Sequence, residues 1–167
     1  MQLNDFEGMP SSDASELEEA TDAVEPLSEN QLCMKAIQEV LQSLTTNISD
    51  SEEESKEDRL ASVLDAKILD FGAGRGQLGQ LLTENGFTNV FGQEGSEAKK
   101  QFLLRKGYYA DIVSYIVGKQ GLPSAYRRSF DVVTCAGGLG TNLLPARCFD
   151  DMLNALRPGG FIIFTVS

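Results

Sequence analysis

Three glycines alternate with other residues in the segment ILDFGAGRGQLGQLL, which covers residues 68–82. Gly72, Gly74 and Gly76 form a turn between an apolar strand pattern and an apolar helix pattern. Such a turn lets a ligand approach the backbone where a side chain would block it. Asp70 precedes the turn by two residues, so we expect a carboxylate at its edge.

The glycine spacing fits two kinds of ligand site. Gly74, Gly76 and Gly79 match the dinucleotide-binding fingerprint, whereas Gly72, Gly74 and Gly76 match a shorter glycine turn. Glu94 follows Gly74 by 20 residues, where an acid would bind ribose hydroxyls in either kind of site. The spacing therefore leaves both open.

The charge of Asp70 separates the two kinds of ligand. A dinucleotide places its pyrophosphate against the turn and the helix N-terminus, where backbone amides favour anions. A carboxylate beside those phosphates would cost on the order of a few kcal/mol in a partly buried site. S-adenosylmethionine carries an ammonium and a sulfonium group and no phosphate, so Asp70 would attract it. We therefore favour this methyl donor and keep a dinucleotide as the alternative.

Strand and helix patterns alternate from Lys67 onward, and these elements must position the turn. Strands are predicted at residues 67–71, 89–94, 108–113, 130–136 and 161–166, and helices at residues 77–84, 97–106 and 146–156. Strands that are apolar along most of their length indicate a parallel sheet covered on both faces. We predict an α/β fold with a doubly wound, Rossmann-like sheet that binds its ligand beyond the carboxyl ends of the strands.

Acidic residues are concentrated ahead of this α/β region. Residues 1–66 contain 17 Asp and Glu against 3 Lys and Arg, a net charge of −14. Residues 67–167 contain 8 against 11, a net charge of +3. The overall charge of −11 therefore describes the N-terminal part and not the region that carries the glycine turn.

Composition and periodicity predict three parts in the chain. Residues 1–27 are expected to be a disordered acidic leader. Residues 28–66 are expected to hold an N-terminal helix at about 29–45, opened by a capping box, and an acidic linker that is most charged at residues 49–58. The ligand-binding domain is expected over residues 67–167.

Residue types exclude several functions. The chain has no histidine, which excludes Ser-His and Cys-His hydrolytic chemistry within it. Cys33, Cys135 and Cys148 match no metal motif, so we predict reduced, buried thiols and no metal site.

No apolar run approaches the roughly 20 residues that span a bilayer, and no basic patch favours nucleic acid. We expect a soluble protein of the cytoplasm or nucleus that contacts neither membranes nor nucleic acids.

Four segments resemble, in order, the motifs of class I S-adenosylmethionine-dependent methyltransferases. They are ILDFGAGRG, VFGQEGS, SFDVVTCAGGL and LRPGGFIIFTV, and together they cover about 100 residues. The resemblance implies that Asp70 binds the methionine ammonium, directly or through water. It also implies that Gly72, Gly74 and Gly76 let the backbone approach the donor.

The same resemblance implies the residues around the adenosine end of the donor. Glu94 would bind both ribose hydroxyls, and Gly95 or Ser96 would lie near the adenine. Asp111, placed after the third strand, would bind the adenine amino group.

Methyl transfer from a sulfonium is an in-line displacement from an activated leaving group, so alignment of the acceptor can supply much of the rate. We therefore predict no particular catalytic residue. The loop at residues 136–142 would begin the acceptor site, and it lacks the Asn/Asp-Pro-Pro-aromatic motif of enzymes that methylate nucleic-acid amino groups. Cys135 belongs to a strand and is expected in the core. A small molecule or a protein side chain is the expected acceptor, and its identity stays open.

The resemblance covers five of the seven strands usual in this family, because the last predicted strand ends at Val166. The antiparallel pair that follows in the family would be missing, and the fifth strand would be an exposed apolar edge. A partner chain could cover that edge. Three functions follow: a methyltransferase, a non-catalytic methyltransferase-like binding or scaffold module, and an NAD(P)-dependent oxidoreductase.

Overall fold

The computed structural model describes residues 26–47, 56–140 and 144–166 of the 167-residue chain. Its strands are β1 (Ile68–Phe71), β2 (Val90–Glu94), β3 (Asp111–Ser114), β4 (Phe130–Leu139) and β5 (Leu156–Val166). Its helices are α1 (Glu29–Asn47), α2 (Lys56–Leu64), α3 (Gln77–Glu84), α4 (Glu97–Lys106) and α5 (Cys148–Ala155), with a short 3₁₀ turn η1 (Ser124–Tyr126).

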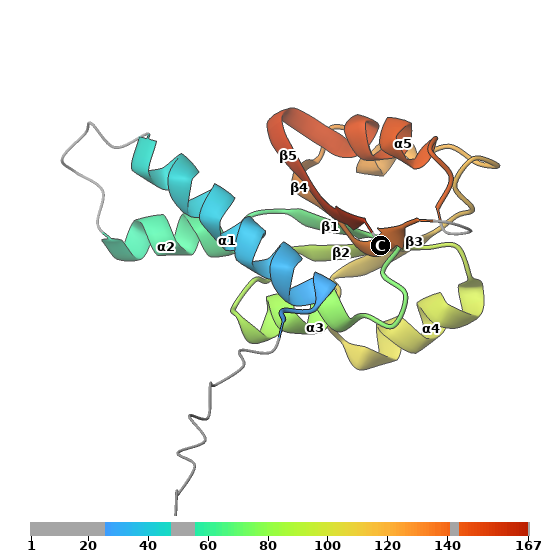
Figure 1. Ribbon diagram of the computed structural model, residues 1–167, viewed down its shortest axis with the longest axis horizontal. Helices are drawn as coiled ribbons and strands as arrows, with labels where there is room; N and C mark the ends of the chain where they lie inside the picture. The colour runs from blue at the N-terminus through green and yellow to red at the C-terminus, as the bar shows by residue number, and fades with distance from the viewer. Residues whose placement is uncertain (1–25, 48–55, 141–143, 167) are drawn as a thin grey trace, which may run out of the picture.

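The five strands form one parallel sheet in the order β3-β2-β1-β4-β5 (Figure 1). The chain builds the sheet outward from β1 to β3 and then crosses back to add β4 beside β1. This reversal between β1 and β4 is the place where an open α/β sheet binds ligands, at the carboxyl ends of its strands. The predicted fold class, an α/β doubly wound Rossmann-like sheet, is confirmed.

Neighbouring residues of each strand face opposite helix layers. Ile68 and Val132 pack with residues of α1, α3 and α4, whereas Leu69 and Val133 pack with residues of α5. Figure 1 shows α3 and α4 together on one side of the sheet and α5 on the other. Because both faces are covered, the strands are apolar along most of their length, as the sequence pattern predicts.

The N-terminal helix α1 is part of this packed unit. The Ser28 backbone N–H donates to Gln31 Oε1 at 2.8 Å, and the Gln31 backbone N–H donates to Ser28 Oγ at 3.3 Å, which is the predicted capping box. Ile37 of α1 is fully buried in the core that also contains residues of α3. The helix predicted at about 29–45 is therefore confirmed, and it covers β4 and β5 beside α3.

The linker prediction is wrong from Lys56, where α2 begins. The first turn of α2 is charged, so its sequence resembles that of the linker. Its apolar stripe is short: Val63 is buried and Leu64 packs against the core. Residues 1–25 and 48–55, on which the leader prediction and the rest of the linker prediction fall, lie outside the described residues. No helix in the described part of the chain combines the length and apolar character needed to cross a membrane.

Three predicted strand boundaries differ from the structure by three or more residues. β3 begins at Asp111, three residues later than predicted, because the apolar Tyr109 side chain is buried in the core ahead of the strand. β4 continues to Leu139, three residues beyond its predicted end. β5 begins at Leu156, five residues earlier than predicted, and a bulge lies between Leu156 and Phe161, where the register to β4 shifts.

β5 lies at the edge of the described sheet and exposes apolar side chains. Phe164 is 44% exposed and Val166 is 70% exposed. An apolar edge strand offers unpaired backbone groups to another strand. A partner chain that covers this edge stays a prediction.

We expect Val166→Lys to reduce self-association of the protein, because a charged side chain on an edge strand disfavours strand addition. Leu60→Lys is the matched control, since Leu60 is 58% exposed on α2, away from the sheet edge. Light scattering over a concentration series should show a lower average mass for Val166→Lys alone. Equal masses for both variants and the unmodified protein would contradict an associating edge.

Candidate functional site

A cavity of about 420 Å³ lies at the carboxyl ends of β1, β2, β3 and β4. Its walls come from the glycine turn after β1, from the end of β2, from residues 115–117 after β3, from Gly137 and Gly138 near the end of β4, and from Leu144 and Pro145. This volume is within the range of about 300–1,000 Å³ that is usual for small-molecule sites. The cavity therefore occupies the place where the fold predicts a ligand.

The glycine turn has the geometry that only glycine adopts readily. Gly72, Gly74 and Gly76 have φ angles of 76°, 56° and 79°, all in the left-handed region. A Cβ on Gly76 would lie 2.7 Å from Leu103 in the core, so this glycine also serves packing. A Cβ on Gly74 would have only the Gly72 carbonyl oxygen nearby, at 3.7 Å, and Gly74 lines the cavity. Gly72 also lines the cavity, but a Cβ there would lie 3.2 Å from Leu144, so Gly74 is the glycine of the turn with the more open backbone.

Asp70 lies beneath the turn and does not line the cavity. It is 3% exposed, and its Oδ2 accepts a hydrogen bond from the Tyr109 hydroxyl at 2.7 Å. Burial raises the pKa of Asp70 to about 6, and the hydrogen bond from Tyr109 opposes this only in part. Its charge is also close enough to raise the pKa values of the buried Cys33 and Cys135 thiols, although burial is the larger cause.

Glu94 is the buried carboxylate on the cavity wall, at the end of β2. Its Oε1 accepts the Ser96 backbone N–H at 3.0 Å and lies 3.9 Å from Lys99 Nζ. Gly95 also lines the cavity. Ser96 instead caps α4, where its side chain accepts the Lys99 backbone N–H at 3.4 Å.

Asp111 is not placed as the sequence analysis expects. It is the first residue of β3 and pairs with Phe91, whereas Ser114 at the other end of the strand pairs with Glu94. Asp111 therefore lies toward the opposite edge of the sheet from the cavity. Its Oδ2 accepts the Tyr126 hydroxyl at 2.7 Å, which gives it a structural partner. The expectation that Asp111 follows the third strand is wrong, since β3 begins at this residue and ends at Ser114.

Gln93 connects three walls of the cavity, and the sequence analysis does not identify it. It is 1% exposed, its Oε1 accepts the Gly72 backbone N–H at 3.1 Å, and its Nε2 donates to the Tyr115 carbonyl oxygen at 2.9 Å. Its own carbonyl oxygen accepts the backbone N–H groups of Gly72 and Ala73, at 3.1 and 2.9 Å. A polar side chain next to Glu94 at the end of a buried strand is the signal that the sequence offers.

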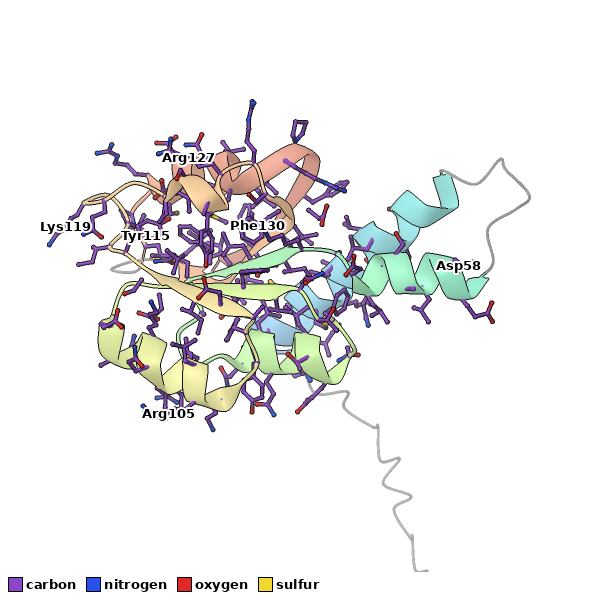
Figure 2. All side chains as sticks on the ribbon, turned by 180° about the vertical axis from the view of Figure 1, so that it is seen from behind. Asp58, Arg105, Tyr115, Lys119, Arg127 and Phe130 are labelled. Carbon is purple, nitrogen blue, oxygen red and sulfur yellow. The ribbon has the colours of Figure 1, made fainter. Side chains whose placement is uncertain are left out.

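The segment after β3 supplies the wall on the far side of β2. Tyr115 lies on the α5 side of the sheet, packed edge-on against Phe71, and its hydroxyl donates to Asp151 at 3.2 Å (Figure 2). This anchoring holds the backbone of residues 115–117 against the cavity. Val117 is buried, so the wall here is largely apolar, as is usual for small-molecule sites.

A family model described as a methyltransferase domain matches residues 31–167. The chain belongs to the methyltransferase domain family. The matched range starts inside α1, so this helix is part of the methyltransferase domain, which the sequence analysis begins only at residue 67.

Relatives of the methyltransferase domain support this assignment. Human methyltransferase-like protein 27 is 29% identical over 100 residues, which are 60% of this chain and 40% of that protein. The chain therefore spans less than half the length of this curated relative.

Two solved structures share the fold of the methyltransferase domain. The sugar N-methyltransferase KedS8 from a Streptoalloteichus species has a TM-score of 0.57 and 18% identity, over 100% of this chain and 59% of that one. A TehB-like S-adenosylmethionine-dependent methyltransferase from Corynebacterium glutamicum has a TM-score of 0.50 and 19% identity, over 78% and 72% of the two chains. At these identities the likeness concerns the fold.

Gln93→Ala should lower the free energy of unfolding by about 1–3 kcal/mol, because the buried Tyr115 carbonyl loses its side-chain donor. Gln80→Ala is the control, since Gln80 is exposed and its side chain donates to Glu84 within α3. Its effect should stay within about 0.5 kcal/mol. Urea unfolding measures both, and similar losses in the two variants would contradict the role of Gln93.

Asp70 should make stability depend on pH in a defined direction. An acid with a raised pKa holds its proton more tightly in the folded state, so it stabilises the fold below about pH 4 and loses this contribution as the pH rises through about 6. A pKa difference of one corresponds to about 1.4 kcal/mol, so the free energy of unfolding should fall by about 3 kcal/mol. Relative to Asp70→Asn, the unmodified protein should lose stability between about pH 4 and 6.5 in urea unfolding. A difference that is constant or grows with pH would contradict this account.

Proposed function

We propose that this domain binds S-adenosylmethionine and transfers its methyl group to a small-molecule or protein acceptor. The observation that carries the proposal is the cavity itself, in which the bare backbone at Gly74 and the carboxylate of Glu94 face the same space. A carboxylate at the end of the second strand suits two ribose hydroxyls. The membership of the methyltransferase domain family supports the same ligand.

Charge around the cavity favours a ligand without phosphate. Among the described residues that line it, Lys99 is the only cation, and it lies beside Glu94 and not at the turn. Asp70 adds negative charge beneath the turn once it is ionised. A pyrophosphate at the turn would meet this charge, whereas an ammonium or sulfonium group would be attracted. This is the physical reason to prefer the methyl donor over a dinucleotide.

The donor would supply a methyl group on an already activated sulfonium. The chain must then bind the nucleoside, orient it and exclude water, and the walls formed by Glu94, Tyr115 and Leu144 are suited to these tasks. Cys135 is fully buried, and burial raises the pKa of its thiol to about 12. It is therefore unsuited to act as a nucleophile, and the acceptor attacks the methyl group directly.

Calorimetric titration tests the ligand. We expect S-adenosylhomocysteine to bind and NADH not to bind. Glu94→Ala should weaken S-adenosylhomocysteine by about 1–3 kcal/mol, because charge-assisted hydrogen bonds to the ribose are removed. Glu97→Ala is the control, since Glu97 is exposed on α4 and does not line the cavity.

Binding of NADH alone, or equal affinity in both variants, would contradict the proposed site. Transfer of labelled methyl groups from the donor to metabolites or proteins of a lysate distinguishes a methyltransferase from a binding or scaffold module. Donor binding without any transfer would favour the module.

A further inference from the structure

The Tyr109 side chain lies beneath the glycine turn, in space that three glycines leave open. It precedes β3, and it is 7% exposed. A Cβ on Gly79 of α3 would collide with the Tyr109 ring and hydroxyl. Cβ atoms on Gly76 and Gly92 would lie 3.5 and 3.3 Å from the same ring. Because side chains are absent at these three positions, the tyrosine can reach from the segment after α4 to the first strand.

The Tyr109 hydroxyl contacts Asp70, the acid that lies behind the turn. It donates to Asp70 Oδ2 at 2.7 Å, and Asp70 is 3% exposed. The Thr134 hydroxyl faces Asp70 from the paired position on β4, but it does not complete a hydrogen bond and has the smaller effect on the pKa of the carboxyl. Among the described side chains, Tyr109 is therefore the main polar contact of this buried acid.

The hydrogen bond from Tyr109 favours the ionised form of Asp70. Burial raises the pKa of the carboxyl, because a charge is poorly solvated in the core, and the donated hydrogen bond acts in the opposite direction. Among the described residues, no charged side chain of α3 or α4 contributes to this shift.

The other titratable groups near Asp70 belong to α1 and β4. α1 brings the Cys33 thiol, with Glu29 one turn earlier, and β4 brings the Cys135 thiol. Burial raises the pKa values of these thiols to about 11 and 12, so both stay neutral where Asp70 titrates. The charge behind the turn therefore depends on the state of Asp70, which its tyrosine partner influences.

We propose that Tyr109 is a positioning residue for the methyl donor: its hydroxyl holds the ionised Asp70 carboxylate beneath the glycine turn, where the negative charge attracts the cationic methionine end. This inference rests on the proposed function. Asp70 does not line the cavity, so it acts on the donor through its field and not by direct contact. Tyr109 acts only through Asp70.

Two ligands separate this role from a general effect on the cavity. S-adenosylhomocysteine carries the methionine-derived ammonium, whereas 5′-methylthioadenosine has the same nucleoside thioether and lacks the amino acid. Tyr109→Phe keeps the ring and removes only the hydroxyl. Calorimetric titration of the full chain at pH 7 should show S-adenosylhomocysteine weakened about twofold to tenfold, because less of Asp70 is ionised, and 5′-methylthioadenosine unchanged.

Tyr126→Phe is the matched control. It also removes a tyrosine–aspartate hydrogen bond of 2.7 Å, to Asp111, which lies away from the cavity. The preference for S-adenosylhomocysteine over 5′-methylthioadenosine should be the same in this variant as in the unmodified protein. If Tyr109 only stabilised the fold, Tyr109→Phe would leave the preference unchanged as well.

The pH dependence of this preference gives a second readout. In the unmodified protein the preference should decline as the pH falls through about 6, because Asp70 is then protonated. In Tyr109→Phe the decline should begin at a higher pH, since loss of the donated hydrogen bond raises the pKa of Asp70. Glu94 affects both ligands alike, so its titration cancels in the ratio. In Asp70→Asn the preference should not depend on pH, and adding Tyr109→Phe should change it no further.

A second variant displaces the tyrosine and keeps its hydroxyl. The methyl group of Gly79→Ala would collide with the Tyr109 ring and hydroxyl, so this variant should reduce the preference as Tyr109→Phe does. An unchanged preference and pH profile in Tyr109→Phe and Gly79→Ala, an equal loss for both ligands, or a further loss on the Asp70→Asn background would overturn the inference and leave the proposed function in place. Failure of the unmodified protein to bind either ligand would overturn the proposed function and, with it, the inference.

Discussion

The hydrogen bonds between the glycine turn and Gln93 are the interaction on which the site depends. The backbone N–H groups of Gly72 and Ala73 bond to the Gln93 carbonyl oxygen, and the Gln93 side chain joins Gly72 to the Tyr115 carbonyl. These bonds link the ends of three adjacent strands, β1, β2 and β3. Since a buried amide without a partner is costly, the turn is held in one geometry and the cavity beside it stays open.

The acidic groups around this cavity have different environments, and the difference decides what each can do. Glu94 faces the cavity and accepts a backbone N–H, so it is available to a ligand that donates hydrogen bonds. Asp70 is buried, bonded to Tyr109, and has a raised pKa, so its effect on a ligand is that of a charge behind the turn. Together they make the cavity suited to a cationic nucleoside, which agrees with the methyltransferase domain family.

Most helices and strands are predictable from the sequence, because their formation and their ends depend on residues that are close together in the chain. The helices at residues 77–84 and 97–106 were predicted to the residue, since a glycine turn, a serine cap and a terminal glycine mark their ends. α2 was missed because charged residues dominate its first turn and its apolar stripe is short.

Side-chain roles that depend on distant partners could not be predicted in this way. Gln93 bonds to Gly72 and Tyr115, each about 20 residues away in the chain. No local sequence pattern therefore identifies these partners. The position of Asp111 at the start of β3, away from the cavity, depends on where the strand pairs with β2, which the local pattern does not fix. The hydrogen bond that joins Asp70 to a tyrosine 39 residues further along the chain is hidden from local patterns for the same reason.

A crystal structure of the protein soaked with S-adenosylhomocysteine and NADH together tests the central claim most directly, namely that the glycine turn suits a cationic nucleoside without phosphate. The account predicts density for S-adenosylhomocysteine in the cavity, with its ribose hydroxyls on Glu94 and its thioether beyond Gly74. A diphosphate bound across residues 72–76, with no S-adenosylhomocysteine there, would contradict it.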